Sequence, residues 1–350
     1  MKNICFATVT SEVYDDQAAG LYLNLRNYYH DVNIVLCTID EPSYIRLKQI
    51  NDNNLLCVKA ADIWGNTLWD NVRGRMNGYE RANATKAALA HWILNNYSTK
   101  VLILDNDLLF LKPIDDIIDK LKKYAMLITP IRRSLSRWKR TQKVGLFQGG
   151  FVGFSKEGIH YAYAWKKLCF NYTRELFEDS LFYDQKYRDY FVGLNGVYIV
   201  VNTGINVTGS QLRSIHIPYC DEKGIWRVKD GSEIIVFHNM NGTPREFPLS
   251  ILKQKYDMEG AKLINLKKPS NVITEMRQRR TEVRQRRFLK TIHAGRIFFK
   301  TRELLFSLHV GVIHIIVNIE RLLLLNDMNI FKRLSALINK NDLMRQYFDD

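Results

Sequence analysis

Short apolar runs alternate with amphipathic segments through the first hundred residues. The apolar runs are Ile4–Val9, Asn33–Thr38, Leu55–Val58 and Val101–Leu104. The segments between them repeat apolar residues with a helical period, and they are Asp15–Leu25, Pro42–Ile50 and Glu80–Leu94. Because strands that alternate with helices build a mostly parallel sheet with helices on both faces, the pattern predicts an α/β fold.

The pattern is less regular in the following residues. Further strands are predicted at Ala125–Thr129, Gly149–Phe154, Tyr198–Asn202 and Glu233–His238, and helices at Ile114–Lys123 and His160–Asn171. A polar and strongly basic stretch, Arg132–Lys143, is predicted to be a loop. No internal repeat is visible.

Positive charge is concentrated at the end of the chain. The 350 residues carry 51 basic and 36 acidic side chains, a net charge of +15, and the stretch from Lys267 to Asp350 accounts for +9 of it. The sequence therefore predicts two parts, an α/β domain over 1–266 and a basic helical tail over 267–350. Such an excess of positive charge indicates an anionic partner or surface.

The tail combines a basic segment with an apolar one. Arg277–Lys290 holds seven basic residues in fourteen positions, and Leu304–Leu325 is apolar but interrupted by His309 and His314. The apolar part is short for a membrane span, so we expect peripheral association with an anionic membrane surface. Helical packing or homo-oligomerisation is the alternative, and no nucleic-acid-binding motif is present.

The cysteines and the N-terminus indicate the compartment. Cys5, Cys37, Cys57, Cys169 and Cys220 form no C-x-x-C pair, and their number is odd. We therefore expect free thiols in a reducing compartment, without a zinc site. The first residues begin a strand rather than a secretory signal, so we expect a cytoplasmic protein at the inner face of the membrane.

Two carboxylates directly follow the fourth apolar run. Val101–Leu104 leads into Asp105, Asn106 and Asp107. The carboxyl ends of the strands are where ligands bind in open α/β sheets. Because hard divalent cations prefer carboxylate oxygens and could neutralise a diphosphate, Asp105 and Asp107 are candidate metal ligands.

The ten residues from Leu104 to Pro113 also resemble the Asp-x-Asp segment of nucleotide-sugar-dependent glycosyltransferases of the GT-A fold. The chain is most similar to the glycogenin-like group and its bacterial lipopolysaccharide galactosyl- and glucosyltransferase relatives, over about Lys2–Pro248. The resemblance implies a Rossmann-like domain, Mn²⁺ or Mg²⁺ as cofactor, a nucleotide-sugar donor with UDP favoured, and retention of anomeric configuration.

The resemblance also implies roles for individual residues. The residues implied to bind the donor are Ala7, Thr8, Thr10, Tyr14, Lys86, Asp105, Asn106, Gln148, Gly149 and Gly150. Asp184 and Gln185 resemble the Asp-Gln pair at the reaction centre, and His238 would be the third metal ligand. The family's His-x-x-Gly is here His-x-x-x-Gly, and Thr243-Pro244-Arg245 replaces its Lys-Pro-Trp, so Arg245 would contact phosphate.

These residues suit transfer of a glycosyl group. A metal and a cation can stabilise the charge on a departing nucleoside diphosphate, and the Arg132–Lys143 loop could close over it. Asp184 would act as general base in an inverting enzyme, or would line the oxocarbenium-like sugar with Gln185 in a retaining one. The predicted function is sugar transfer to a glycan or lipid-linked acceptor in bacterial surface polysaccharide synthesis.

Two other functions remain open from the sequence. A nucleotidyltransferase would share the sheet, the metal and the nucleotide, but Thr8–Gln17 lacks its Gly-rich phosphate loop. A non-enzymatic membrane or nucleic-acid adaptor would act through the basic tail alone. The chain has neither a G-x-G-x-x-G motif nor a P-loop, which argues against dehydrogenases and P-loop kinases.

Overall fold

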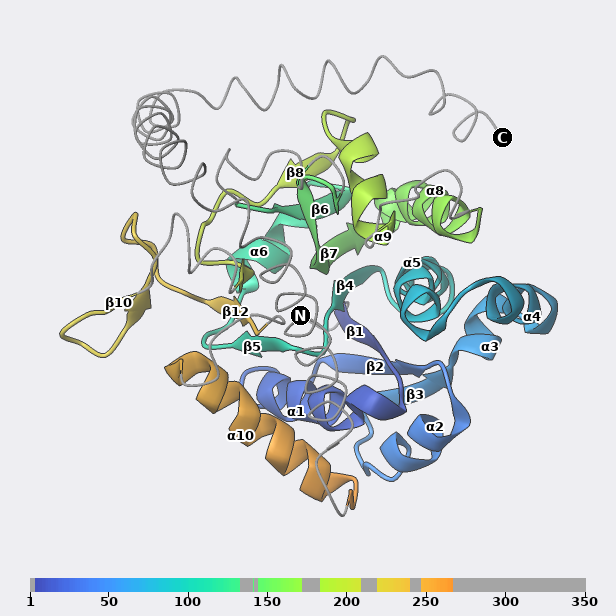
Figure 1. Cartoon of the computed structure of the whole chain (residues 1–350). Coiled ribbons are helices and arrows are strands. Elements are labelled where there is room, and N and C mark those ends of the chain that lie inside the picture. The colour runs from blue at the N-terminus through green and yellow to red at the C-terminus, as the bar shows by residue number, and fades with distance from the viewer. Residues whose placement is uncertain are drawn as a thin grey trace, which may run out of the picture. The chain divides into compact units, whose positions relative to one another are not determined.

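The structure is a computed structural model of the chain (Figure 1). It describes residues 4–132, 141, 144–171, 183–208, 219–239 and 247–266. Arg245, most of the Arg132–Lys143 loop and the whole predicted tail, 267–350, lie outside the described residues. Membrane binding and oligomerisation through the tail therefore stay predictions.

Within the described residues, the central sheet has seven strands in the order β3-β2-β1-β4-β7-β6-β8 (Figure 1). They are β1 (Ile4–Thr10), β2 (Asn33–Thr38), β3 (Leu55–Lys59), β4 (Lys100–Leu104), β6 (Met126–Pro130), β7 (Phe147–Ser155) and β8 (Val197–Ile199). The β1 strand pairs in parallel with β2 and β4, whereas β7 is antiparallel to β4 and β6. The predicted α/β class with a mostly parallel sheet is confirmed.

Helices connect and cover these strands. They are α1 (Asp15–Arg26), α2 (Glu41–Leu47), α3 (Ala60–Trp64), α4 (Asn66–Arg75), α5 (Gly78–Asn96), α6 (Asp115–Lys120), α8 (Ile159–Phe170), α9 (Tyr183–Lys186) and α10 (Pro248–Leu263), with 3-10 turns η1 (Glu12–Tyr14), η3 (Lys156–Gly158) and η5 (Tyr187–Phe191). A reciprocal capping box between Asn77 and Glu80 starts α5 and fixes the helix that carries Lys86.

The β4 strand divides the core into two layers. Alternate strand residues point to opposite faces, so Val101 and Ile103 join one apolar cluster, and Leu102 and Leu104 join the other. All four are fully buried. A continuous apolar run is what a strand covered on both faces requires, which explains why this element was predictable.

A second, smaller sheet brings distant segments together. Its strands are β5 (Leu108–Phe110), β12 (Val236–His238) and β9 (Val207–Thr208), with β12 in the middle. The register pairs His238 with Leu108, the residue that follows Asp107. Another pair, β10 (Tyr219–Cys220) and β11 (Trp226–Arg227), forms the projecting hairpin at the left of Figure 1.

The last described helix, α10, packs closely against α1. At the crossing, a Cβ on Gly260 would lie 2.6 Å from the carbonyl oxygen of Asp16, and one on Gly20 would lie 2.8 Å from that of Tyr256. Glycine at both positions allows this approach. On the buried side of α10, Lys253 forms an ion pair with Asp257.

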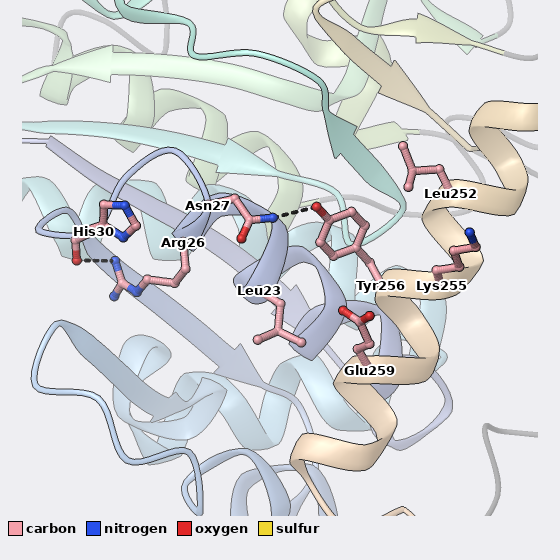
Figure 2. Close-up of a pocket in the computed structure, with 8 residues that line it drawn as sticks. All are labelled: Leu23, Arg26, Asn27, His30, Leu252, Lys255, Tyr256 and Glu259. Carbon is pink, nitrogen blue, oxygen red and sulfur yellow. Dashed lines mark hydrogen bonds between the residues drawn. The ribbon is translucent and has the colours of Figure 1, made fainter.

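A shallow pocket of about 440 Å³ lies between α1 and α10 (Figure 2). Its polar contacts join Asn27 Nδ2 to Tyr256 Oη at 2.6 Å and Arg26 to the carbonyl of His30 at 3.2 Å. The C-terminal part of α1 lines this pocket. Because α1 directly follows β1 and runs back along the sheet, this end of the helix lies near the amino ends of the strands. The pocket therefore lies at the opposite edge of the sheet from Asp105.

Two other sequence expectations can be compared with the structure. All five cysteines are free; Cys5, Cys37 and Cys169 are buried, but Cys220 is exposed. Among the described helices, none has the length and apolar character that crossing a membrane would need.

Candidate active site

Three side chains with metal-ligating atoms converge at the carboxyl end of β4. Asp105 and Asp107 lie in the turn between β4 and β5, and His238 ends β12. His238 Nε2 lies 2.9 Å from Asp107 Oδ1 and 3.5 Å from Asp105 Oδ2, and one ligand atom from each residue lies within 4.8 Å of the others. The structure thus brings together the three residues predicted as metal ligands.

The imidazole of His238 is oriented by a buried amide. His238 Nδ1 lies 2.9 Å from Asn206 Oδ1, and Asn206 Nδ2 donates to Thr129 Oγ1 at 2.9 Å. Asn206 adopts φ of 60°, a left-handed conformation that asparagine tolerates better than most residues. When Nδ1 donates its proton to Asn206, Nε2 is free to face the two carboxylates and bind a metal.

Mutual attraction links His238 with Asp107 in the metal-free protein. Burial lowers the pKa of His238, but the charge and hydrogen bond of Asp107 outweigh it, so the pKa is raised. Burial raises the pKa of Asp107, but His238 and the cations Lys253 and Lys86 bring it down to about 2. Asp107 therefore stays ionised over the physiological range.

The arrangement fits a divalent cation. Two carboxylates and one imidazole form a donor set suited to metals such as Mn²⁺. Gly150 lies against this set, since a Cβ there would be 2.5 Å from Asp105 Oδ2 and 2.6 Å from His238 Cε1. Any larger residue would press into the ligands, so glycine keeps the space beside them open.

Lys86 provides a buried cation beside the metal ligands. Its ammonium donates to Asp105 Oδ1 from the inward face of α5. Burial lowers the pKa of Lys86, but the charges of Asp105 and Asp184 outweigh it and raise the pKa. Lys86 therefore remains charged, as a cation facing a diphosphate would have to be.

The Gly-rich turn and the Asp-Gln pair lie against each other. The Gly149 amide donates to Gln185 Oε1 at 3.1 Å, and Gln185 Nε2 donates to the carbonyl of Val144 at 2.7 Å. At the next residue, the Gly150 carbonyl accepts a hydrogen bond from the Asp105 amide at 2.9 Å. The β7 strand thus connects the metal ligands to Asp184 and Gln185, which are far apart in sequence.

An arginine that the sequence analysis missed completes this part of the site. Arg188, in η5, is fully buried and donates to Asp184 Oδ2 at 3.2 Å and to the carbonyl of Gln148. Its guanidinium lies 4.6 Å from the centre of the Trp165 ring. The spacing of four residues from Asp184 was the available signal, because such pairs meet on one face of a helical turn.

Comparison with known proteins gives matches by structure alone. No protein-family model and no curated protein matches the chain by sequence. The galactosyltransferase LgtC, solved in complex with donor and acceptor sugar analogs, superimposes with a TM-score of 0.50 and 13% identity, covering 74% of this chain and 95% of its own. The chain has the GT-A glycosyltransferase fold.

Other solved glycosyltransferases are similar at lower scores. GlyE of Streptococcus pneumoniae TIGR4 is 12% identical, with a TM-score of 0.47, 76% of this chain covered and 62% of its own. Xyloside xylosyltransferase 1 of mouse is 11% identical, with a TM-score of 0.44, 69% of this chain covered and 99% of its own.

The residues that the resemblance assigns to the nucleotide lie at the end of β1 in this GT-A fold. Thr8 Oγ1 donates to Asn106 Oδ1 at 2.5 Å, and Asn106 Nδ2 donates to the carbonyl of Val9 at 3.1 Å. The Ala7 methyl packs in the apolar core and Thr10 is buried, whereas Tyr14 is 41% exposed. Of these, Tyr14 is the side chain best exposed for stacking on a base.

Two further polar residues of α5 lie at helical spacing from Lys86, on the same side of the helix. Tyr79 and Asn83 precede it by seven and three residues, a helical spacing that could have identified them once Lys86 was predicted. Desolvation of the hydroxyl, and then the charge of Asp184, raises the pKa of Tyr79, although the residue as a whole is 49% exposed. Asn83 is buried, and its side chain forms a hydrogen bond with the Tyr79 hydroxyl.

Of the predicted cationic lid, Arg132–Lys143, the structure describes Arg132 and Thr141. Arg132 donates to the carbonyls of Val200, Asn202 and Ile205, at 3.0 to 3.3 Å. Burial lowers its pKa to about 10. Arg132 therefore supports the loop that precedes Asn206, and the contribution of the remaining lid residues and of Arg245 stays a prediction.

Proposed function

We propose that this protein is a metal-dependent glycosyltransferase that uses a nucleotide-diphosphate sugar. The observation that carries the proposal is the convergence of Asp105, Asp107 and His238 beside Lys86 at the carboxyl edge of the sheet. This is the edge at which α/β folds bind nucleotides. LgtC, which shares the fold, is a galactosyltransferase solved with donor and acceptor sugar analogs, and this supports the same class of reaction.

Each part of the site has a function in this reaction. Asp105, Asp107 and His238 would hold Mn²⁺ or Mg²⁺, which when bound would offset the negative charge of the leaving diphosphate. Lys86 adds a fixed positive charge that needs no reorganisation as the bond to the sugar breaks. Gln185 accepts a hydrogen bond from the Gly149 amide, and together with Asp184 it would line the donor sugar, as in a retaining enzyme.

We further propose UDP as the favoured carrier and a glycan or lipid-linked acceptor. The half-exposed Tyr14 is a stacking surface for a base near the end of β1. The basic sequence of 267–350 suits an anionic membrane surface, where lipid-linked acceptors of bacterial surface polysaccharides lie.

Thermal unfolding of the full chain tests this function. The panel contains UDP-, GDP-, CMP- and dTDP-sugars, each with Mn²⁺, Mg²⁺ or a chelator. A donor that binds the native state raises the midpoint by mass action, so we expect a rise with one nucleotide class that disappears with chelator. A midpoint that no donor and metal combination moves would contradict the proposal.

A further inference from the structure

Arg188 connects the two segments that would contact the donor sugar. Its guanidinium donates to the Asp184 carboxylate and to the carbonyl of Gln148, which begins the Gly-rich turn. Trp165 supports the same arrangement twice, since its ring lies under the guanidinium and its Nε1 donates to the Asp184 carbonyl at 3.0 Å. Asp184 is therefore held at its backbone and at one carboxylate oxygen.

Fold stability does not account for this arginine. Burying an ion pair is often no better for stability than filling the same volume with apolar side chains, and Trp165 already offers an apolar surface. Arg188 Nε has no hydrogen-bond partner among the described residues, although the group is buried. Burial also lowers the pKa of Arg188, although the charge of Asp184 acts to raise it. A buried, incompletely satisfied cation beside a site indicates a requirement of the site.

The contacts of Asp184 show what Arg188 provides. Arg188 occupies Oδ2, and within the described residues Asp184 Oδ1 has no hydrogen bond. Lys86 pairs with Asp105 and Arg188 pairs with Asp184, so each of these two carboxylates has its own cation. The rigid planar fork of an arginine can bind a carboxylate and a carbonyl at once in a fixed geometry, whereas the donors of a lysine ammonium are rotatable and sit on a flexible stem.

We propose that Arg188 is a positioning residue that fixes the Asp184 carboxylate for the donor sugar and holds the Gln148–Gly150 turn against it. The inference rests on the proposed function and deepens it. Arg188 would act through Asp184 and would touch neither the sugar nor the metal.

A double-mutant cycle on kcat tests this role in the full chain. We expect Arg188→Met to lower kcat about 100-fold, the scale of a small misplacement of a reacting group, with little change in the donor KM. In an Asp184→Asn background the same change should cost nothing further, because residues that act as one unit are not additive. Arg188→Lys keeps the charge without the fork and should recover part of the lost kcat.

Arg26→Met is the matched control. Arg26 forms a 2.7 Å pair with Asp52 at the far end of α1, so its loss should lower the midpoint of unfolding and leave kcat unchanged. If Arg188→Met also lowers only the midpoint, or if its effect multiplies with that of Asp184→Asn, the inference is wrong. Should Arg188→Met fail to fold, Arg188→Lys with wild-type kcat would overturn it. A wild-type chain that transfers sugar from no donor would instead refute the proposed function and the inference together.

Discussion

The two halves of the site differ in how their charges are arranged. In the metal half, the side chains of Asp105 and Asp107 are 22% and 30% exposed, and they face an imidazole. In the half proposed to contact the donor sugar (the sugar half), the side chains of Asp184 and Arg188 are 3% and 0% exposed, and they form an ion pair with each other. The metal half presents charge to an incoming ion, whereas the sugar half is internally neutral.

This difference separates binding from orientation. The carboxylates of the metal half pair with Lys86 and His238 but stay partly exposed, so a metal ion can still reach them, and that half should respond strongly to metal. The sugar half is a fixed arrangement of dipoles and one carboxylate, which suits stabilisation of a transition state without reorganisation. Substitutions in the two halves should therefore have separable effects on metal affinity and on kcat.

The largest expected effect is in the metal half. Asp107→Asn removes the charge closest to His238, and we expect transfer to fall by about a thousandfold or more, a loss of the order produced by deleting a central electrostatic group. Asp119→Asn on the exposed side of α6 is the control, since Asp119 pairs with Lys122 at the surface. Initial rates and unfolding midpoints should be measured together. Full activity in folded Asp107→Asn would contradict the metal role.

Neighbouring glycines allow the two halves to be compared directly. In Gly150→Ala the new Cβ would lie 2.5 Å from Asp105 Oδ2, whereas in Gly149→Ala its nearest atoms would be 3.6 Å away. We expect Gly150→Ala to weaken Mn²⁺ binding by about 100-fold, near the upper end for disturbed metal sites, and Gly149→Ala to leave it intact. Titration with Mn²⁺, monitored by electron paramagnetic resonance, measures the two affinities. Equal Mn²⁺ affinities in Gly150→Ala and Gly149→Ala would contradict the role of Gly150 in keeping the space beside the metal ligands open.

Orientation of His238 should contribute less. Asn206→Gly keeps the left-handed backbone and removes the oxygen that holds Nδ1, so Mn²⁺ affinity should fall by about 10-fold. Asn265→Gly is the matched control, because Asn265 also has positive φ, 54°, but lies after α10. The same titration applies, and parallel results for the two variants would show that Asn206 does not orient the ligand.

Mn²⁺ binding should also depend on pH. The pKa of His238 is raised in the metal-free protein, and a metal requires neutral imidazole. Mn²⁺ affinity should therefore fall as pH decreases through that pKa, by up to about tenfold per unit, because one proton competes with the ion. Asp107, with a pKa of about 2, contributes nothing in this range. An affinity that stays constant between about pH 8 and pH 6 would contradict the coupling.

The sequence predicted best those elements that depend on a local pattern of residues. The apolar run before Asp105 predicted the position of β4, helical spacing predicted α5, and the resemblance indicated Lys86 on that helix. The resemblance indicated His238 despite the altered spacing, and the structure does bring it to the two aspartates. Asn206 carries no local signal for its position, since its contact with His238 depends on strands paired across the chain.

Other features were missed for related reasons. Sequence periodicity did not predict α10, whose buried side depends on Gly20 and Gly260 at a crossing between distant helices. The antiparallel pairing of β7 with β4 and β6 was not predicted either, because the hydrophobic pattern identifies each strand but not its partners or its direction. Arg188 had a usable spacing from Asp184, but its importance appears only when Gln148 and Trp165 are placed around it.

The central claim is that Asp105, Asp107 and His238 hold a divalent cation that binds the diphosphate of the donor. Calorimetric titration of UDP into the wild-type chain and Asp107→Asn, each with Mn²⁺ or with chelator, tests it most directly. We predict that Mn²⁺ tightens UDP binding to the wild type by at least about tenfold and has no effect on the variant. Equal UDP affinity in Mn²⁺ and chelator, or an undiminished Mn²⁺ effect in Asp107→Asn, would contradict the claim.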